Sequence, residues 1–173
     1  VGDMRYAPNV DGVRWFAEAV WPQVKAECPQ AQFHIVGRGA PRSVQQLAGI
    51  PGIRVVGEVP ETLPCLLNCQ VVVAPLRIAR GVQNKVLEAL AMARPVLSTT
   101  VGAEGLDLGD TVVLQDDPAA FADGVLDAFA HRDAWAARAR AGRERVLEKH
   151  EWGRIAPKQL EVWKRVAARG RRG

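Results

Sequence analysis

The sequence predicts an α/β fold in which a parallel sheet is covered by helices on both faces. Five short apolar runs, rich in β-branched residues, alternate with longer segments of helical periodicity. Continuous apolar runs are typical of strands that are buried on both faces, as in parallel sheets. The strand–helix alternation implies right-handed βαβ units, and so a doubly wound parallel sheet with extra helices at its C-terminal end.

Each expected element has a sequence signal. The strands are expected at 33–36, 53–56, 71–74, 95–98 and 111–114. The helices are expected at 10–27, 41–49, 60–69, 82–93, 117–130, 133–149 and 152–168. Asp117 followed by Pro118 marks one helix start, because an acidic cap and a proline in the first turn favour helix initiation.

Composition limits the class of protein. The chain has 173 residues, about one domain, and is 48% hydrophobic and 24% charged, which excludes a disordered or fibrous chain. Three cysteines at non-metal spacing argue against a disulfide framework and predict a reducing, cytoplasmic setting. The opening residues 1–4 look like the end of a strand entering a loop, so the chain is expected to be one domain of a longer protein.

Positive charge is concentrated in the last quarter of the chain. Residues 1–130 hold 10 Lys and Arg against 14 Asp and Glu, whereas residues 131–173 hold 13 against 5. Solvated helix faces account for this pattern, and so does contact with acidic lipid head groups or an acidic partner. Nucleic acid is not an expected partner, because no aromatic–basic motif accompanies the charge.

The densest polar constellation lies at residues 80–88, after the expected strand 71–74 and at the start of the helix 82–93. Ligands of open α/β sheets bind beyond the carboxyl ends of strands, where helix N-termini favour phosphate. Cations, a glycine and a carboxylate one turn into the helix suit a diphosphate with an attached ribose. A helix-capping loop with an incidental Lys–Glu pair remains the alternative. The candidates are Arg80, Gly81, Gln83, Asn84, Lys85 and Glu88.

A second candidate loop, Gly37-Arg38-Gly39, follows the expected strand 33–36. It is not a dinucleotide fingerprint, and turn formation alone also explains its glycines. No His, Cys, Asp and Glu cluster has metal-ligand spacing, and no catalytic residue can be named.

Residues 75–96 resemble the nucleotide-sugar signature of glycosyltransferase family 4, and short matches at 4–9, 35–37, 56–60 and 103–106 extend the resemblance over nearly all of the chain. The resemblance implies a GT-B enzyme and makes this chain its C-terminal, Rossmann-like donor domain. It also implies a separate acceptor-binding N-terminal domain, absent from this chain. Together, the matched segments resemble those of a subgroup of sugar transferases that is associated with bacterial exopolysaccharide and exosortase systems.

By this resemblance, Glu88 matches the second glutamate of the family's Glu-x7-Glu motif and would bind the donor ribose. The first glutamate is replaced by Arg80, which can pair with phosphate or with a sugar carboxylate. Lys85 would stabilise the leaving diphosphate. Gly37, Arg38, Gln83 and Asn84 would line the pocket. The family is retaining and metal-independent, so no cofactor is expected beyond the donor itself.

The expected function is therefore transfer of a hexosyl unit from a nucleoside diphosphate sugar to a hydroxyl acceptor, in exopolysaccharide or lipid-linked glycan synthesis. A nucleotide-sugar epimerase of the same fold and a non-catalytic nucleotide-binding module are the alternatives. The isolated domain is expected to be inactive and to form a weak homodimer, and peripheral contact with the inner membrane face is a further expectation.

Overall fold

The computed structural model describes residues 1–79 and 81–170 and shows an α/β fold, as predicted. Five strands lie inside or next to the five apolar runs, and every strand pairing is parallel. The strands are β1 (Phe33–Val36), β2 (Ile53–Gly57), β3 (Val72–Ala74), β4 (Val96–Ser98) and β5 (Val113–Leu114). They form two sheets, β1-β2 and β3-β4-β5, where one sheet was expected.

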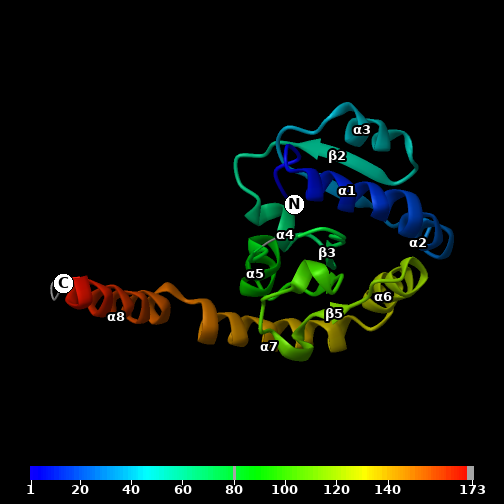
Figure 1. Ribbon diagram of the computed structural model, residues 1–173. Helices are drawn as coiled ribbons and strands as arrows, with labels where there is room; N and C mark the ends of the chain where they lie inside the picture. The colour runs from blue at the N-terminus through cyan, green and yellow to red at the C-terminus, as the bar shows by residue number, and fades with distance from the viewer. Residues whose placement is uncertain (80, 171–173) are drawn as a thin grey trace.

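The first helical rod starts earlier than predicted. It consists of α1 (Ala7–Trp15), a π-helical segment (Phe16–Val20) and α2 (Trp21–Glu27). Pro8 in the first turn sets the early start, because its fixed φ suits a helix start and its missing N–H is not needed there. The rod lies beside the β1-β2 sheet (Figure 1).

The remaining helices connect and cover the strands. They are α3 (Arg42–Gln45), α4 (Leu63–Leu67), α5 (Asn84–Ala91), α6 (Pro118–Ala130), α7 (Arg132–His150) and α8 (Trp152–Gly170). The predicted cap of α6 is confirmed: Asp117 accepts from the amides of Ala119 and Ala120, both at 3.0 Å. Such a cap stabilises a helix by about 1 kcal/mol.

Two hydrophobic clusters hold these layers together. In the first, the ring of Phe16 lies 4.5 Å from that of Phe33 and 5.8 Å from that of Phe121, which joins the first rod to β1 and α6. In the second, Leu90 of α5 and Val96 of β4 are both fully buried. Burying each such side chain stabilises the folded state by about 1.5–3 kcal/mol. The two clusters therefore hold the strands in place, and with them the loops that follow the strands.

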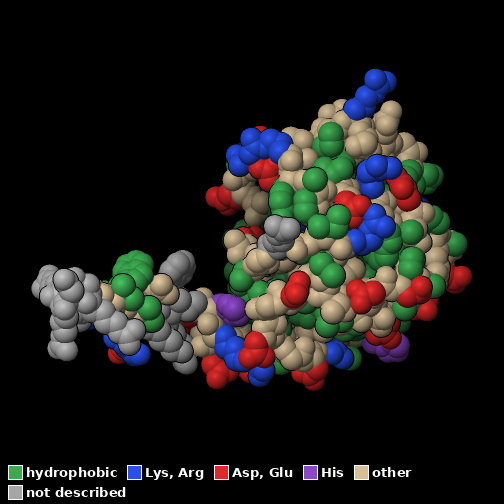
Figure 2. Space-filling view, in the orientation of Figure 1, with side chains coloured by type: hydrophobic (Ala, Val, Ile, Leu, Met, Phe, Trp, Pro, Cys, Tyr) green, Lys and Arg blue, Asp and Glu red, His purple; other side chains and the backbone are tan. Residues whose placement is uncertain are grey.

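Helix α8 projects from the body of the protein (Figure 1). Three of its apolar side chains, Leu160, Trp163 and Val166, are exposed, and Figure 2 shows hydrophobic side chains on this arm clear of the main body. Among the described residues, no helix has the length and apolar character that crossing a membrane requires.

Candidate functional site

The site is built around the start of α5. Gln83 has extended backbone angles and Asn84 begins the helix, two residues later than predicted. Gly81 has a φ of 73°, a conformation that glycine adopts without steric cost. No side chain of the N-cap residue bonds to the helix amides, so this terminus keeps its affinity for an anion.

Lys85 lies on the first turn of α5 and is half-buried. Its ammonium group donates a hydrogen bond to the side-chain oxygen of Asn9. Burial lowers the pKa of Lys85 to about 8, and the charge of Glu88 opposes this shift in part. Within the part of the chain that the structure describes, no carboxylate forms an ion pair with Lys85. A partly desolvated cation whose described hydrogen-bond partner is a neutral amide attracts an anion strongly.

Asn9, at the start of α1, holds Lys85 in place. It is 7% exposed, and its amide nitrogen donates to the carbonyl oxygen of Asp3 at 2.8 Å. That bond turns the side-chain oxygen of Asn9 toward Lys85. Asn9 is not among the site residues predicted from the sequence, although it ends the matched stretch 4–9. No local pattern distinguishes it, because α1 also carries the polar residues Asp11 and Arg14.

Asp3 connects this pair to the second candidate loop. The guanidinium of Arg38 donates to Asp3 at 3.0 Å, and Arg5 donates to the same carboxylate. These hydrogen bonds, with that of Arg5 the largest cause, hold the pKa of Asp3 well below its usual range. The loop 37–39 and the start of α5 are therefore linked through Arg38, Asp3, Asn9 and Lys85.

Gly37 permits the close approach that this link requires. Its φ is +145°, and a Cβ atom there would lie 1.7 Å from the carbonyl oxygen of Gly2. No other residue fits without moving the backbone. The glycine of this loop is thus explained by packing against residues 1–3.

The other residues predicted for the site lie outside the network of Arg38, Asp3, Asn9 and Lys85. Asn84 and Glu88 are exposed, one turn apart on α5. Gln83 is buried, and its amide nitrogen donates to the carbonyl oxygen of Gly81 at 3.1 Å, which stabilises the loop. Arg80 lies outside the described residues. The structure therefore brings Gly37, Arg38 and Lys85 into one network and leaves Asn84 and Glu88 beside it.

The loop that leads from β3 to α5 is fixed to its surroundings. Arg77 donates to Asp11 of α1 at 3.0 Å, and a Cβ atom on Gly12 would lie 2.7 Å from the carbonyl oxygen of Pro75. The hydroxyl of Thr99, after β4, donates to the carbonyl oxygen of Leu76. These contacts hold three segments together at the carboxyl ends of the strands, where open α/β sheets bind ligands.

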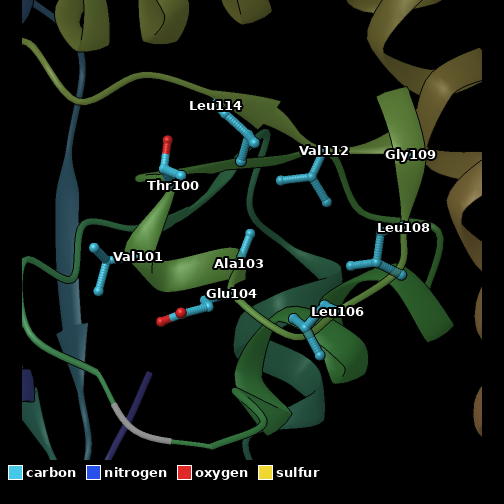
Figure 3. Close-up of a pocket in the computed structure, with 9 residues that line it drawn as sticks. All are labelled: Thr100, Val101, Ala103, Glu104, Leu106, Leu108, Gly109, Val112 and Leu114. Carbon is cyan, nitrogen blue, oxygen red and sulfur yellow. The ribbon is translucent and has the colours of Figure 1, made fainter.

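A hollow of about 320 Å³ follows the carboxyl end of β4 (Figure 3). Thr100 and Glu104 are its polar side chains, and the hydroxyl of Thr100 donates to Asp116 at 2.6 Å. Apolar side chains form most of its lining: Val101, Ala103, Leu106, Leu108, Val112 and Leu114. Neither Lys85 nor Glu88 belongs to the lining, so a phosphate at α5 and a group in this hollow would have different surroundings.

The described residues contain no group of three His, Cys, Asp or Glu side chains that could hold a metal ion. The chemistry that the site can offer from its described side chains is electrostatic. Cations and a helix terminus attract an anion, and an exposed carboxylate one turn away accepts hydrogen bonds.

Comparisons with known proteins place the chain in a family. The model of the family described as glycosyl transferases group 1 matches residues 1–131. No curated protein sequence matches the chain.

Solved structures share the fold at low sequence identity. TarM of S. aureus, crystallised as a mutant in complex with fondaparinux, alpha-GlcNAc-glycerol and UDP, has a TM-score of 0.75 at 18% identity, over 94% of this chain and 33% of that one. A glycosyltransferase from Rickettsia africae has a TM-score of 0.77 at 14% identity, over 96% and 46%. HepE of Anabaena, in complex with UDP and glucose, has a TM-score of 0.71 at 14% identity, over 87% and 45%.

The chain thus spans between a third and a half of these structures. Their likeness confirms the predicted fold class, the Rossmann-like fold of a GT-B glycosyltransferase domain. The resemblance to exopolysaccharide and exosortase systems stays a prediction.

Proposed function

Because this chain belongs to the glycosyl transferases group 1 family, we propose that it is the donor-binding domain of an enzyme that transfers a sugar from a nucleoside diphosphate to a hydroxyl acceptor. The observation that carries the proposal is the half-buried ammonium of Lys85 at the start of α5. Its described partner is a neutral amide, so its charge is free to attract a diphosphate.

The network supplies the rest of the diphosphate site. Arg38 is oriented by Asp3 and carries a second positive charge toward the same sheet edge. Asn84 can donate from the exposed first turn of α5. Gln83 shapes the loop through its bond to Gly81 and acts as a positioning residue.

Glu88 is proposed to bind the donor ribose. It is exposed one turn beyond the helix start, and a carboxylate accepts hydrogen bonds from two vicinal hydroxyls. One helical turn, about 5.4 Å, separates the start of α5 from Glu88. This spacing lets Lys85 contact the diphosphate while Glu88 contacts the ribose of the same nucleotide.

The chemistry proposed for Lys85 is stabilisation of the departing diphosphate. Negative charge develops on the phosphate oxygen as the bond to the anomeric carbon breaks. A fixed cation in a partly dry site stabilises that charge more than water does. Lys85 is therefore proposed to act on the transition state as well as on binding.

The acceptor is proposed to bind to a second domain of the whole protein. The chain spans 33–46% of the three structures above, which leaves room for such a domain. Two of these structures are complexes with UDP, and one of the two also contains glucose, so a uridine nucleotide and a hexosyl donor are the first candidates. We further propose a cytoplasmic site of action in exopolysaccharide or lipid-linked glycan synthesis, with the basic C-terminal quarter at the inner membrane face.

Calorimetric titration tests the donor site. The chain is titrated with UDP, GDP, uridine and guanosine, and the Lys85→Met variant is titrated in the same way. Loss of the ammonium should weaken diphosphate binding about tenfold or more and leave nucleoside binding nearly unchanged. Arg140→Met, an exposed charge deletion on α7, is the matched control. Equal UDP affinity for Lys85→Met and the parent would place the donor elsewhere.

A further inference from the structure

The segment that leads from β3 into α5 is attached to α1 at both of its ends. At its start, the carbonyl oxygen of Pro75 lies so close to Gly12 of α1 that a Cβ atom on the glycine would come within 2.7 Å of it. At its end, the ammonium of Lys85 donates to the side-chain oxygen of Asn9. Both contacts are made by the first two turns of α1, so the position of α1 and that of the segment depend on each other.

Arg77 adds a charged contact between these two ends. Its Nε donates to Asp11 of α1 at 3.0 Å, and a second nitrogen of the same guanidinium donates to the other carboxylate oxygen. Two such parallel hydrogen bonds fix the direction of the guanidinium as well as its distance. Two side chains that follow in the loop, Ile78 and Val82, are 60% and 54% exposed and can do little to hold it. The ion pair with Asp11 is therefore the tether next to this exposed stretch.

Arg77 and Lys85 hold α1 from different sides. Their partners, Asp11 and Asn9, are two residues apart in α1, and two residues turn a helix by about 200°. Asn9 accordingly lies inside the protein and is 7% exposed, whereas the side chain of Asp11 is 28% exposed. With one contact on each side, α1 cannot turn or slide relative to the start of α5 without breaking one of them.

A neighbouring ion pair shows what is particular about the pair of Arg77 and Asp11. Arg14 donates to Glu18 at 3.0 Å, but both residues belong to the first helical rod, so their bond joins no second segment. Exposed ion pairs of either kind contribute little to folding stability. The hydrogen bonds of Arg77, by contrast, join two segments that lie 66 residues apart in the sequence. Their main effect is therefore on where the loop lies, and only secondarily on the stability of the fold.

We propose that Arg77 and Asp11 are positioning residues for the diphosphate site: their ion pair holds the loop and the first turn of α5 against α1, so that Lys85 is in place before a nucleotide binds. The body of α5 is held separately by Val86 and Leu90, which are both fully buried, so loss of the pair loosens the loop without unfolding the helix. The inference rests on the proposed function, because it takes the start of α5 as the diphosphate site.

The physical reason is the entropy of ordering. A site whose charged groups move in the free protein must order them when the ligand binds, and this ordering opposes binding. The ion pair of Arg77 and Asp11 does part of that ordering in advance, when the protein folds. Neither residue needs to touch the nucleotide for this effect, and the removal of either partner should weaken diphosphate binding to the same extent.

Calorimetric titration of the 173-residue chain with UDP tests the pair. Arg77→Met, Asp11→Asn and the double variant are compared with the parent. Each single substitution should weaken UDP binding about fivefold, and the double variant should bind no more weakly than either, because all three lose the same interaction. Uridine, which has no phosphate, should bind to all four proteins alike. Arg14→Met breaks the ion pair within the first helical rod and is the matched control, so its UDP affinity should equal that of the parent.

Rescue separates a positioning role from general damage. The exchanged pair, Asp11→Arg with Arg77→Asp, should bring UDP affinity back to within about twofold of the parent, because the opposite charges meet again. Thermal melts of all variants should lie within about 3 °C of the parent, as expected for an exposed ion pair. If Arg77→Met fails to fold, Arg77→Gln, which keeps two N–H donors, takes its place in the same comparison.

Parental UDP affinity in Arg77→Met, together with weakened binding in Lys85→Met, would overturn the positioning role and leave the donor site in place. Tighter UDP binding by Asp11→Asn would also overturn it, because a guanidinium released from Asp11 would then contact the diphosphate directly. Losses that add in the double variant would show that the two residues act separately, which contradicts the proposal. Equal UDP affinity of Lys85→Met and the parent would instead overturn the proposed donor site itself.

Discussion

Lys85 and Asn9 lie 76 residues apart in the sequence and share a hydrogen bond in the structure. The bond joins the start of α5 to the start of α1 and places a half-buried cation between them. Because Asn9 is itself held by the carbonyl oxygen of Asp3, the ammonium has a fixed position before any ligand arrives. Fixed charges contribute most to binding when they need no reorganisation.

Glu88→Gln should weaken binding of a nucleoside diphosphate sugar. The substitution keeps the shape of the side chain and removes its charge, and charge-assisted hydrogen bonds are about twice as strong as neutral ones. We expect a loss of roughly 1–3 kcal/mol, or about ten- to a hundredfold in Kd, measured by calorimetry. Glu144→Gln on α7 is the control and should leave Kd unchanged. A melting temperature that falls far below that of the parent would instead make Glu88 a structural residue.

UDP binding should depend on pH through Lys85. Its pKa is lowered to about 8, so the free protein loses this charge as the pH rises above that value, and UDP affinity should then fall. Lys85→Arg keeps its charge and should bind UDP with little change between pH 7 and 9. The buried amine of Val1 and the carboxylate of Glu88 are the neighbouring titratable groups. A pH profile that is the same in both proteins would exclude Lys85 from the diphosphate site.

The folding stability of the domain should rise with pH because Lys85 titrates at a lower pH in the folded chain than in the unfolded chain. Burial lowers the pKa of Lys85 from 10.5 to about 8, so between these values the unfolded chain binds more protons than the folded chain. The free energy of unfolding therefore increases as the pH rises through this window. Urea unfolding at pH 7.5 and 9.5 measures the change, and Lys85→Met should reduce it.

Ala93→Gly should stabilise the domain by up to about 1 kcal/mol. Ala93 has a φ of 51°, and the amides of Ala93 and Arg94 donate to Leu90 at 2.8 Å and Ala89 at 2.9 Å. This is a Schellman motif, in which glycine is the favoured residue at the left-handed position. Ala91→Gly, at the last residue of α5, is the control and should lower the free energy of unfolding, because glycine has a lower helix propensity than alanine. A drop in Tm for Ala93→Gly would show that its methyl group packs.

The 173-residue chain alone should bind UDP without transferring sugar from any donor. The expectation follows from the proposed second domain, which would hold the acceptor on the other side of the donor. Mass spectrometry of reactions with UDP-glucose and a mixture of glycoside acceptors measures transfer. Product formation at rates comparable to those of two-domain enzymes would show that the site is complete within this chain.

Helix α8 should mediate weak self-association. Leu160, Trp163 and Val166 repeat every three residues and are 49%, 63% and 64% exposed, so they form one apolar stripe. Sedimentation velocity at rising concentration should show a dimer that Trp163→Glu abolishes and Gln159→Glu does not. A strict monomer that binds phosphatidylglycerol vesicles would assign the stripe to the membrane instead.

Local patterns determined the elements of this fold. The apolar runs at 33–36 and 53–56 became β1 and β2 with almost the expected limits, because strand preference is carried by the residues themselves. The helix cap at Asp117 was readable for the same reason. The helix expected at 60–69 is shorter in the structure, Leu63–Leu67, with Pro64 in its first turn and Leu66 as its buried side chain.

Residue types and spacing alone also predicted the charged loop at 80–88 as a candidate site. They did not predict the hydrogen bonds that link Lys85 to Asn9 and Asp3. Asn9 and Asp3 enter the site through hydrogen bonds across 76 and 35 residues, and no local pattern encodes such distances. The division of the strands into two sheets is also a tertiary feature, because the pairing of the strands decides which strand edges stay unpaired. Sequence therefore determined which segments become strands and helices, whereas packing decided which side chains meet, since long-range contacts depend on how whole elements are placed.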